Sequence, residues 1–166
     1  SSWFFDKKRA AMGAMADLGI HKTDLIQYLL DTTVAETRAF VGTLDKKDAA
    51  GNFIGVDDNA ICIYTMNNGI VGTMTASWSY YGEEDNSTVL YGTEGIMKIY
   101  SNPKYDIDKI QTNDNQTKSG IIDAFVESIV KNEEPVISGK SVLSAMRAVF
   151  ASIEASECGH TVKIRQ

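Results

Sequence analysis

The residues of this chain that are best suited to chemistry lie in one short segment, 17–24, where two aspartates flank a histidine. Asp17 precedes His21 by four residues, and Asp24 follows it by three. At about 100° per residue, an α-helix places these positions within roughly 60° of one another, on one stripe. Carboxylates beside a histidine suit proton transfer, because a carboxylate can fix the imidazole tautomer and stabilise its protonated form. One aspartate would orient His21 while the other holds a substrate hydroxyl.

Two other interpretations of this segment stay open. Asp17 or Asp24 can cap the helix or form local salt bridges, with His21 as an ordinary residue of the helix surface. Alternatively, side chains four residues apart can share a metal ion, but the sequence shows no second group of ligands to complete such a site. We therefore predict that the chain has no metal site.

A helix has to carry this segment. No proline occurs between residues 10 and 30, and apolar residues recur there at helical spacing, which predicts a helix at least from Asp17 onward. Several apolar residues lie beside the polar stripe, so one edge of the helix would be buried while the stripe faces a cleft. They are Leu18, Leu25, Ile26 and Leu29.

The middle of the chain has the pattern of antiparallel strands. We predict a strand over 33–44 and two strands over 58–66 and 70–78, which flank Asn67-Asn68-Gly69. Asn-Gly between apolar runs is a strong hairpin signal. A second hairpin, over 87–100 with a turn at 92–95, is expected to join the same sheet, and 105–110 to add an edge strand.

Two helices and a final strand are predicted to complete the chain. The first begins near Ser119 and stops before Pro135, with apolar residues at helical spacing between them. The second runs over about 140–158, ends at Gly159 and is expected to bury one apolar row. That row is Val142, Met146, Val149 and Ile153. The final strand spans 161–165.

This order of elements predicts one α+β domain over residues 1–166. A large, mostly antiparallel sheet would be covered by helices on one face and open on the other. Tyr81 follows the second strand of the first hairpin, where an aromatic side chain either lines a substrate pocket or simply ends the sheet.

Composition excludes several partners. With a net charge of −6 and a pI near 4.9, the chain shows no basic patch for nucleic acid. Its longest apolar run, 60–64, is far too short to span a membrane, and from the first residues we expect no secretory signal. Cys62 and Cys158 lack the spacing of a zinc site and are predicted to be reduced thiols of a cytoplasmic protein.

The stretch from Gly13 to Leu25 resembles the Gly-x-Leu-x-Asp-x-Gly-x-His-x-x-Asp motif that opens the C-terminal domain of the Gfo/Idh/MocA oxidoreductases. That family commonly has three glycines before the motif, whereas this chain has Ala11-Met12-Gly13. Later segments are also similar to the family's landmarks, in the same order. They are 68–72 with Trp78, 91–95, Phe125-Val126, 134–139 and 154–159.

The resemblance implies part of a dehydrogenase that acts on a sugar, polyol or related alcohol. NAD or NADP would be bound mainly by an N-terminal Rossmann domain, which is absent from this chain. The histidine matched by His21 would act as general acid and base, and the aspartate matched by Asp17 would bind or orient the substrate. Asp24 would help position the histidine. Beside these residues, Tyr81, from its place at the strand end, and Asp24 are predicted to contact the substrate.

The resemblance also implies that the open sheet face pairs subunits, so we expect a homo-oligomer. This chain alone is expected to be inactive, because it contains no nucleotide-binding motif. The alternative is a non-catalytic binding or oligomerisation module with the same fold.

Overall fold

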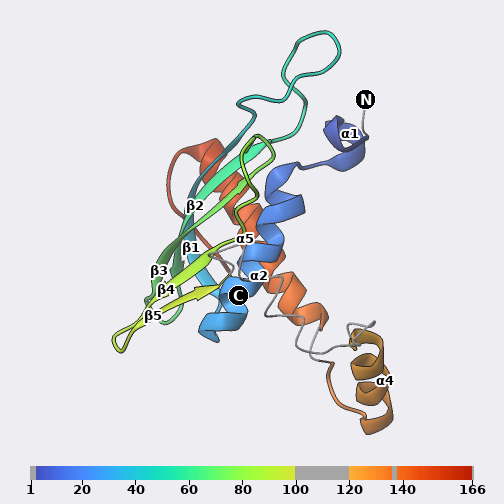
Figure 1. The fold of residues 1–166 in the computed structure, drawn as a ribbon, viewed down its shortest axis with the longest axis vertical. Coiled ribbons are helices and arrows are strands. Elements are labelled where there is room, and N and C mark those ends of the chain that lie inside the picture. The colour runs from blue at the N-terminus through green and yellow to red at the C-terminus, as the bar shows by residue number, and fades with distance from the viewer. Residues whose placement is uncertain (1–2, 100–119, 136–137, 166) are drawn as a thin grey trace. The chain divides into compact units, whose positions relative to one another are not determined.

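The computed structural model describes residues 3–99, 120–135 and 138–165 (Figure 1). Their contacts divide the chain into two compact units. Unit 1 comprises Ser1–Ser79 and Ile137–Gln166, and unit 2 comprises Tyr80–Val136. The expectation that 1–166 forms one domain stays a prediction.

Unit 1 is built on an antiparallel sheet with the strand order β3-β2-β1-β6. Its strands are β1 (Val34–Gly42), β2 (Asn59–Met66), β3 (Val71–Ser77) and β6 (Val162–Lys163). The turn at Asn67-Asn68-Gly69 joins β2 to β3, and Gly69 adopts a φ of 86°, which a glycine tolerates without strain. The predicted strands over 33–44, 58–66, 70–78 and 161–165 are confirmed, as is the predicted α+β class.

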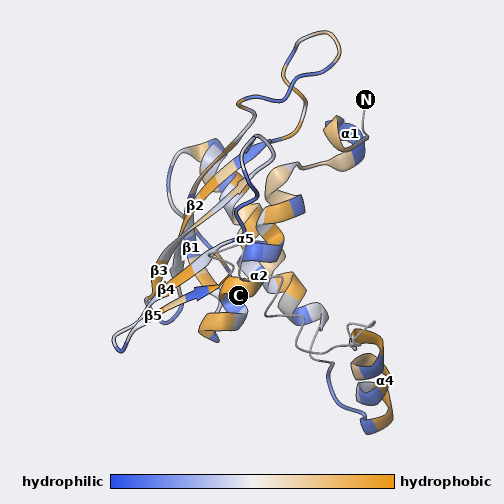
Figure 2. Ribbon diagram, in the orientation of Figure 1, coloured by the Kyte–Doolittle hydropathy of each residue, from blue (hydrophilic) through white to orange (hydrophobic). Residues whose placement is uncertain are grey.

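Alternation along β2 decides which face of the sheet is buried. Ala60, Cys62, Tyr64 and Met66 are all at most 2% exposed and form the centre of the core. Figure 2 shows orange, hydrophobic segments in the sheet and in α5. The residues between them point to the opposite face.

Helices α2 (Ile20–Leu30) and α5 (Gly139–Cys158) cover the buried face of the sheet (Figure 1). α5 packs on β1 and on α2. α5 matches its predicted range and ends at Gly159, which adopts a φ of 73° as a C-terminal glycine often does. α2 begins at Ile20, three residues after the predicted start at Asp17.

The predicted buried row of α5 is wrong in part. Val149 is buried, but Val142 and Met146 are exposed. Small side chains take their place against the sheet, because they let the helix lie close to β1. The buried small residues of α5 are Ala145, Ala148, Ala151, Ser152 and Ala155.

The inner face of α2 is mixed: Ile20, Ile26 and Leu30 pack partly buried against the core, and polar residues are buried beside them, which the apolar pattern did not indicate. Its fully or nearly fully buried residues are Thr23 and Gln27, whereas Leu18, just before it, is 40% exposed. Thr23 Oγ1 lies 3.0 Å from the hydroxyl of Tyr64, and Gln27 Oε1 accepts a hydrogen bond from the Val34 N–H. Side-chain hydrogen bonds therefore fix α2 to β1 and β2.

Two groups on β2 are poor acids in this environment. Burial raises the pKa of the Cys62 thiol and of the Tyr64 phenol above their ordinary values. Among the described residues, no buried side-chain nitrogen or oxygen lacks a hydrogen-bond partner. The polar groups of this core therefore act as structural anchors.

The other face of the sheet is open within unit 1. Phe40 pairs with Ile61 across β1 and β2, and Arg38 pairs with Ile63. Phe40, Ile61, Ile63 and Val71 are each more than 40% exposed. The predicted arrangement, with helices on one face only, is confirmed for this sheet.

Unit 2 contains a hairpin of β4 (Thr88–Tyr91) and β5 (Ile96–Ile99). The two strands were predicted to join the main sheet, but they form a separate two-stranded sheet. Local turn residues determine that β4 pairs with β5, whereas nothing local determines whether another strand joins them. The predicted edge strand at 105–110 lies outside the described residues.

Unit 2 also contains α4 (Ile121–Lys131). The residue that precedes it is Gly120, with a φ of 73°, and Ser119, the predicted cap, lies outside the described residues. α4 presents an exposed apolar row: Ile121, Ile122, Phe125, Val126, Ile129 and Val130.

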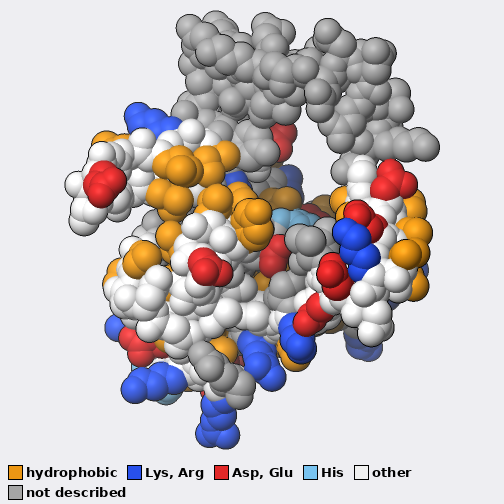
Figure 3. Space-filling model, turned by 90° about the horizontal axis from the view of Figure 1, so that it is seen from below, with side chains coloured by type: hydrophobic (Ala, Val, Ile, Leu, Met, Phe, Trp, Pro, Cys, Tyr) orange, Lys and Arg blue, Asp and Glu red, His pale blue; other side chains and the backbone are white. Residues whose placement is uncertain are grey.

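The surface is mixed in charge. On the face seen in Figure 3, Lys and Arg side chains lie among Asp and Glu side chains. None of the helices in the described part of the chain is long and apolar enough to cross a membrane.

Candidate functional site

The 17–24 segment begins in a π-helical turn, η2 (Met15–Gly19), which leads directly into α2. A π turn holds more residues than an α turn, so the ideal α-helical angles do not apply to Asp17. His21 and Asp24 both lie in α2 and keep the spacing of neighbours on a helix surface. π turns inside helices often occur at functional sites.

Gly13 allows the chain to enter this turn. A Cβ at Gly13 would lie 1.8 Å from the backbone oxygen of Asp57, which no side chain can tolerate. Two residues earlier, Ala11 adopts a φ of 65°, a conformation that favours glycine. Of the two, only Gly13 has a close packing reason to be a glycine.

Asp57 clamps the start of the helix. Its Oδ1 accepts the Gly13 N–H and its Oδ2 accepts the Met15 N–H, both at 2.7 Å. Its backbone oxygen accepts the Ala14 N–H at 2.9 Å. A carboxylate that accepts hydrogen bonds from free N–H groups at a helix N-terminus satisfies them, and its negative charge interacts favourably with the helix dipole.

Gly19, the glycine inside the motif, brings the turn close to the sheet. A Cβ there would lie 2.8 Å from Met15 Sδ and 3.3 Å from Met74 Cε. Met74 belongs to β3, and both methionines are buried in the core. The glycine therefore sets how closely η2 approaches β3.

Trp78 binds the carboxylate of Asp17. The indole Nε1–H donates to Asp17 Oδ2 at 3.0 Å. Trp78 directly follows β3, so the end of that strand aims its side chain at the π turn. Asp17 is half-buried, and among the described residues it makes no other side-chain hydrogen bond.

The indole ring of Trp78 is supported by aromatic residues near the start of the chain. The ring centroids of Phe4 and Phe5 lie 6.2 Å and 6.0 Å from that of Trp78. Both phenylalanines belong to η1 (Trp3–Phe5), which is followed by α1 (Lys7–Ala10). The backbone N–H of Trp78 also donates to the backbone oxygen of Asp58 at 2.9 Å.

His21 and Asp24 are exposed on α2. Neither Asp17 nor Asp24 forms a hydrogen bond or ion pair with His21 among the described contacts. The interpretation in which an aspartate of this segment orients the histidine therefore has no contact to support it here. His21 and Asp17 lie on consecutive turns, with His21 open to an incoming ligand.

Tyr81 belongs to unit 2 and is 74% exposed. Asp17, His21 and Asp24 all belong to unit 1. The place of Tyr81 in a substrate pocket stays a prediction. Within residues 3–99, 120–135 and 138–165, no three His, Cys, Asp or Glu side chains gather so that they could hold a metal ion.

Sequence reasoning missed Asp57 and the role of Trp78. Asp57 lies 42 to 44 residues from the N–H groups that its carboxylate binds, and Trp78 lies 61 residues from Asp17. The Asp-Asp pair at the start of a predicted strand was the available signal for Asp57. For Trp78, the signal was an indole N–H donor at the end of a strand.

Asp58, next to Asp57, organises the loop that follows β1. Its carboxylate is fully buried and accepts the backbone N–H groups of residues 44–46 at 2.6 to 2.9 Å, together with Asn59 Nδ2. Burial by itself raises the pKa of this carboxyl, but the hydrogen bonds from Lys46, Leu44 and their neighbours outweigh it. The net result is a lowered pKa.

This lowered pKa predicts acid sensitivity. Asp58 stabilises the fold fully above its unfolded-state pKa of about 3.9, and the contribution is lost as the pH falls through the lower folded-state pKa. At pH 7, Asp58→Asn is expected to lower the free energy of unfolding by about 2 kcal/mol, since one carboxylate oxygen becomes an amide donor facing N–H groups. The difference from the unchanged protein should shrink between pH 5 and about pH 3.

Urea unfolding followed by circular dichroism at several pH values measures this effect. Asp31→Asn is the matched control, because the Asp31 side chain is exposed and makes no hydrogen bond among the described residues. A stability gap for Asp58→Asn that is the same at pH 7 and pH 3 would contradict the prediction.

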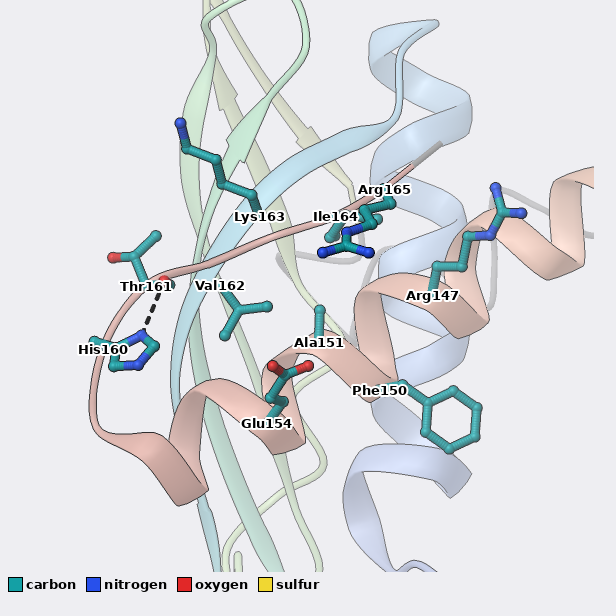
Figure 4. A pocket seen from close by; sticks show the side chains of 10 residues that line it. All are labelled: Arg147, Phe150, Ala151, Glu154, His160, Thr161, Val162, Lys163, Ile164 and Arg165. Carbon is teal, nitrogen blue, oxygen red and sulfur yellow. Dashed lines mark hydrogen bonds between the residues drawn. The ribbon is translucent and has the colours of Figure 1, made fainter.

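A separate hollow of about 490 Å³ lies between α5 and the chain around β6 (Figure 4). Arg147, Glu154 and Arg165 supply its charged groups, and Ala151 and Val162 lie between them. Lys163 also lines it, but Figure 4 shows its side chain pointing away from the helix. None of the predicted site residues lines this hollow.

Comparison with known proteins shows similarity to enzymes of related folds. Levoglucosan dehydrogenase from Pseudarthrobacter phenanthrenivorans is 28% identical over 113 residues, which cover 58% of this chain and 29% of the relative. A structure of levoglucosan dehydrogenase in complex with NADH and levoglucosan superposes with a TM-score of 0.75 at 19% identity, over 99% of this chain and 54% of that one. GenD2 from gentamicin A biosynthesis, in complex with NAD, superposes with a TM-score of 0.73 at 20% identity.

The GenD2 match covers 100% of this chain and 52% of that one, so the chain spans about half the length of these solved structures. At such identities the structural matches establish the fold. The family model of the GFO/IDH/MocA C-terminal domain matches residues 1–98, which include the motif, the Asp57 clamp and Trp78. The resemblance found in the sequence is therefore confirmed: the chain belongs to the C-terminal domain family of the Gfo/Idh/MocA proteins.

Proposed function

We propose that this chain is the substrate-binding part of an NAD(P)-dependent oxidoreductase that acts on a sugar, polyol or related alcohol. The observation that carries the proposal is the fixed Asp17 carboxylate, one turn from an exposed histidine, within the family motif. The matched relatives point to the same chemistry, since they include a levoglucosan dehydrogenase and proteins in complex with NADH or NAD.

His21 is the proposed catalytic residue. An imidazole exchanges protons near neutral pH and can therefore take the proton of a substrate hydroxyl and return it in the reverse direction. Its exposure on α2 leaves the ring nitrogens free to meet a substrate. None of the described residues donates to or accepts from this ring.

Asp17 is proposed to bind the substrate. Trp78 occupies Oδ2, and Oδ1 has lone pairs for a hydroxyl donor from a sugar or polyol. Asp24, three residues after His21 on the same helix surface, is the proposed second carboxylate contact. Tyr81 is retained as a further proposed contact.

The nucleotide cofactor is proposed to bind outside this chain. No Gly-x-Gly-x-x-Gly phosphate-binding turn occurs in the sequence, so the residues of this chain do not fit a dinucleotide site of that kind. A preceding Rossmann domain would hold NAD or NADP, which supplies the hydride chemistry of such enzymes. The chain by itself is accordingly proposed to be inactive.

The open sheet face is proposed to pair two copies of the chain. Phe40, Ile61, Ile63 and Val71 present apolar side chains on one face, and burying such surface favours association. Light scattering of the full-length protein at micromolar concentration should give at least a dimer, and a monomer would contradict the pairing.

The free thiols of Cys62 and Cys158 support a cytoplasmic location.

The direct test uses the full-length protein with a panel of sugars, anhydrosugars and polyols, each with NAD or NADP. Formation of the reduced nicotinamide, followed by its absorbance, should be seen with at least one pair. The alternative, a binding or oligomerisation module, predicts no turnover with any pair. A panel compound that raises the melting temperature without being oxidised would favour that alternative.

A further inference from the structure

Trp78 holds one oxygen of Asp17 and leaves the other available. Its Nε1–H donates to Asp17 Oδ2 at 3.0 Å, and no other described residue bonds to this carboxylate. An indole N–H only donates, so it uses Oδ2 as its acceptor and leaves Oδ1 to accept a hydrogen bond from a ligand hydroxyl. We propose that Trp78 is a positioning residue, which fixes Asp17 so that Oδ1 meets a substrate hydroxyl. This inference rests on the proposed function.

The backbone of Asp17 is fixed as well as its carboxylate. The Asp17 N–H donates to the Gly13 backbone oxygen at 3.0 Å, and the Asp57 clamp holds Gly13 and Met15 in place. The remaining freedom of Asp17 is rotation about its own side-chain bonds. The hydrogen bond from Trp78 acts on that freedom, because it selects one orientation of the carboxylate.

The indole ring is itself held in place. Phe5 packs at 6.0 Å between ring centroids, and Phe4 approaches edge-on at 6.2 Å with an interplanar angle of 71°. The backbone of Trp78 is tied to Asp58 at the start of β2. A donor that cannot turn away keeps its acceptor oriented between turnovers, which is the condition for precise placement of a substrate.

The test compares two matched tryptophan variants of the full-length protein. Trp78→Phe removes the N–H and keeps an aromatic ring against Phe4 and Phe5. Trp3→Phe is the same chemical change at the other tryptophan of the chain, which packs on Phe4 and makes no side-chain hydrogen bond among the described residues. Melting temperatures of both variants check that the fold is retained.

We expect Trp78→Phe to lower kcat/KM about 10- to 100-fold, the usual cost of losing a hydrogen bond to a charged group. The loss should appear mainly in kcat, with KM changed by about threefold or less, because a misplaced substrate still binds but reacts slowly. Trp3→Phe should stay within about twofold of the unchanged protein.

A double-mutant cycle separates positioning from general structural support. In an Asp17→Ala background the carboxylate is gone, so adding Trp78→Phe should cost less than about twofold. An equal loss of kcat/KM from Trp78→Phe in both backgrounds would overturn the role of Trp78. So would an unchanged kcat/KM for Trp78→Phe if Asp17→Ala lowers kcat/KM. Either result would leave the proposed function intact. Full activity of Asp17→Ala would overturn the proposed role of Asp17 itself.

Discussion

Replacing His21 by alanine in the full-length protein is expected to lower kcat about 10²- to 10⁴-fold, the range for removal of a general acid or base. The proposed reaction needs a group that takes the hydroxyl proton. In the 17–24 segment, the imidazole of His21 is suited to that role. The fold should be retained, because His21 is exposed on α2 and alanine is the better helix former. Steady-state kinetics with the oxidised substrate found in the panel measure the effect.

His160→Ala is the matched control, since His160 is the second histidine of the chain. It is exposed next to β6, where its Nδ1 lies 3.5 Å from Cys158 Sγ and 3.2 Å from the Thr161 oxygen. We expect its kcat to remain within about twofold of the unchanged protein. Turnover by His21→Ala at a near-normal rate would remove the histidine from the proposed mechanism.

Gly13→Ala is expected to destabilise the protein by more than about 3 kcal/mol, at the upper end of the cost of overpacking. The new Cβ would overlap the backbone oxygen of Asp57, from which it would lie 1.8 Å. The chain can relieve this overlap only by moving away from Asp57, which breaks the hydrogen bonds at Gly13 and Met15. Asp17 and His21 follow directly in the chain, so activity should fall together with stability.

Gly72→Ala tests whether the effect comes from the close approach. Gly72 lies in β3, and a Cβ added there meets nothing within 4 Å. Gly→Ala at such a position is expected to change the free energy of unfolding by less than about 1 kcal/mol, with a gain as the usual sign. Urea unfolding of both variants, followed by circular dichroism, gives the comparison. Equal stabilities for the two variants would contradict the clamp described for Asp57.

The candidate site could be predicted only in part from the sequence. Asp17, His21 and Asp24 stand within eight residues of one another, so their common helix followed from local periodicity. The π turn was not predictable from that periodicity, because an α-helical pattern assumes about 100° per residue throughout. As a result the sequence placed Asp17 beside His21 on one stripe, whereas the structure ties its carboxylate to Trp78.

What the sequence by itself determined was local. β-branched and small residues predicted β1, and apolar runs on either side of Asn68-Gly69 predicted β2, β3 and the turn between them. Gly159 predicted the end of α5. Each of these signals acts through neighbouring residues, because backbone propensities and turn geometry involve only a few positions.

Only the tertiary structure decided which distant groups meet. It brought Asp57 to Gly13 and Trp78 to Asp17, chose small side chains on α5 for contact with β1, and paired β4 with β5 apart from the main sheet. The physical reason is that a hydrogen bond or a close packing contact depends on separation in space, and residue types along the chain do not specify which partner fills it. The motif identified the chemical groups, and the packing of η2 against β3 oriented one of them, Asp17.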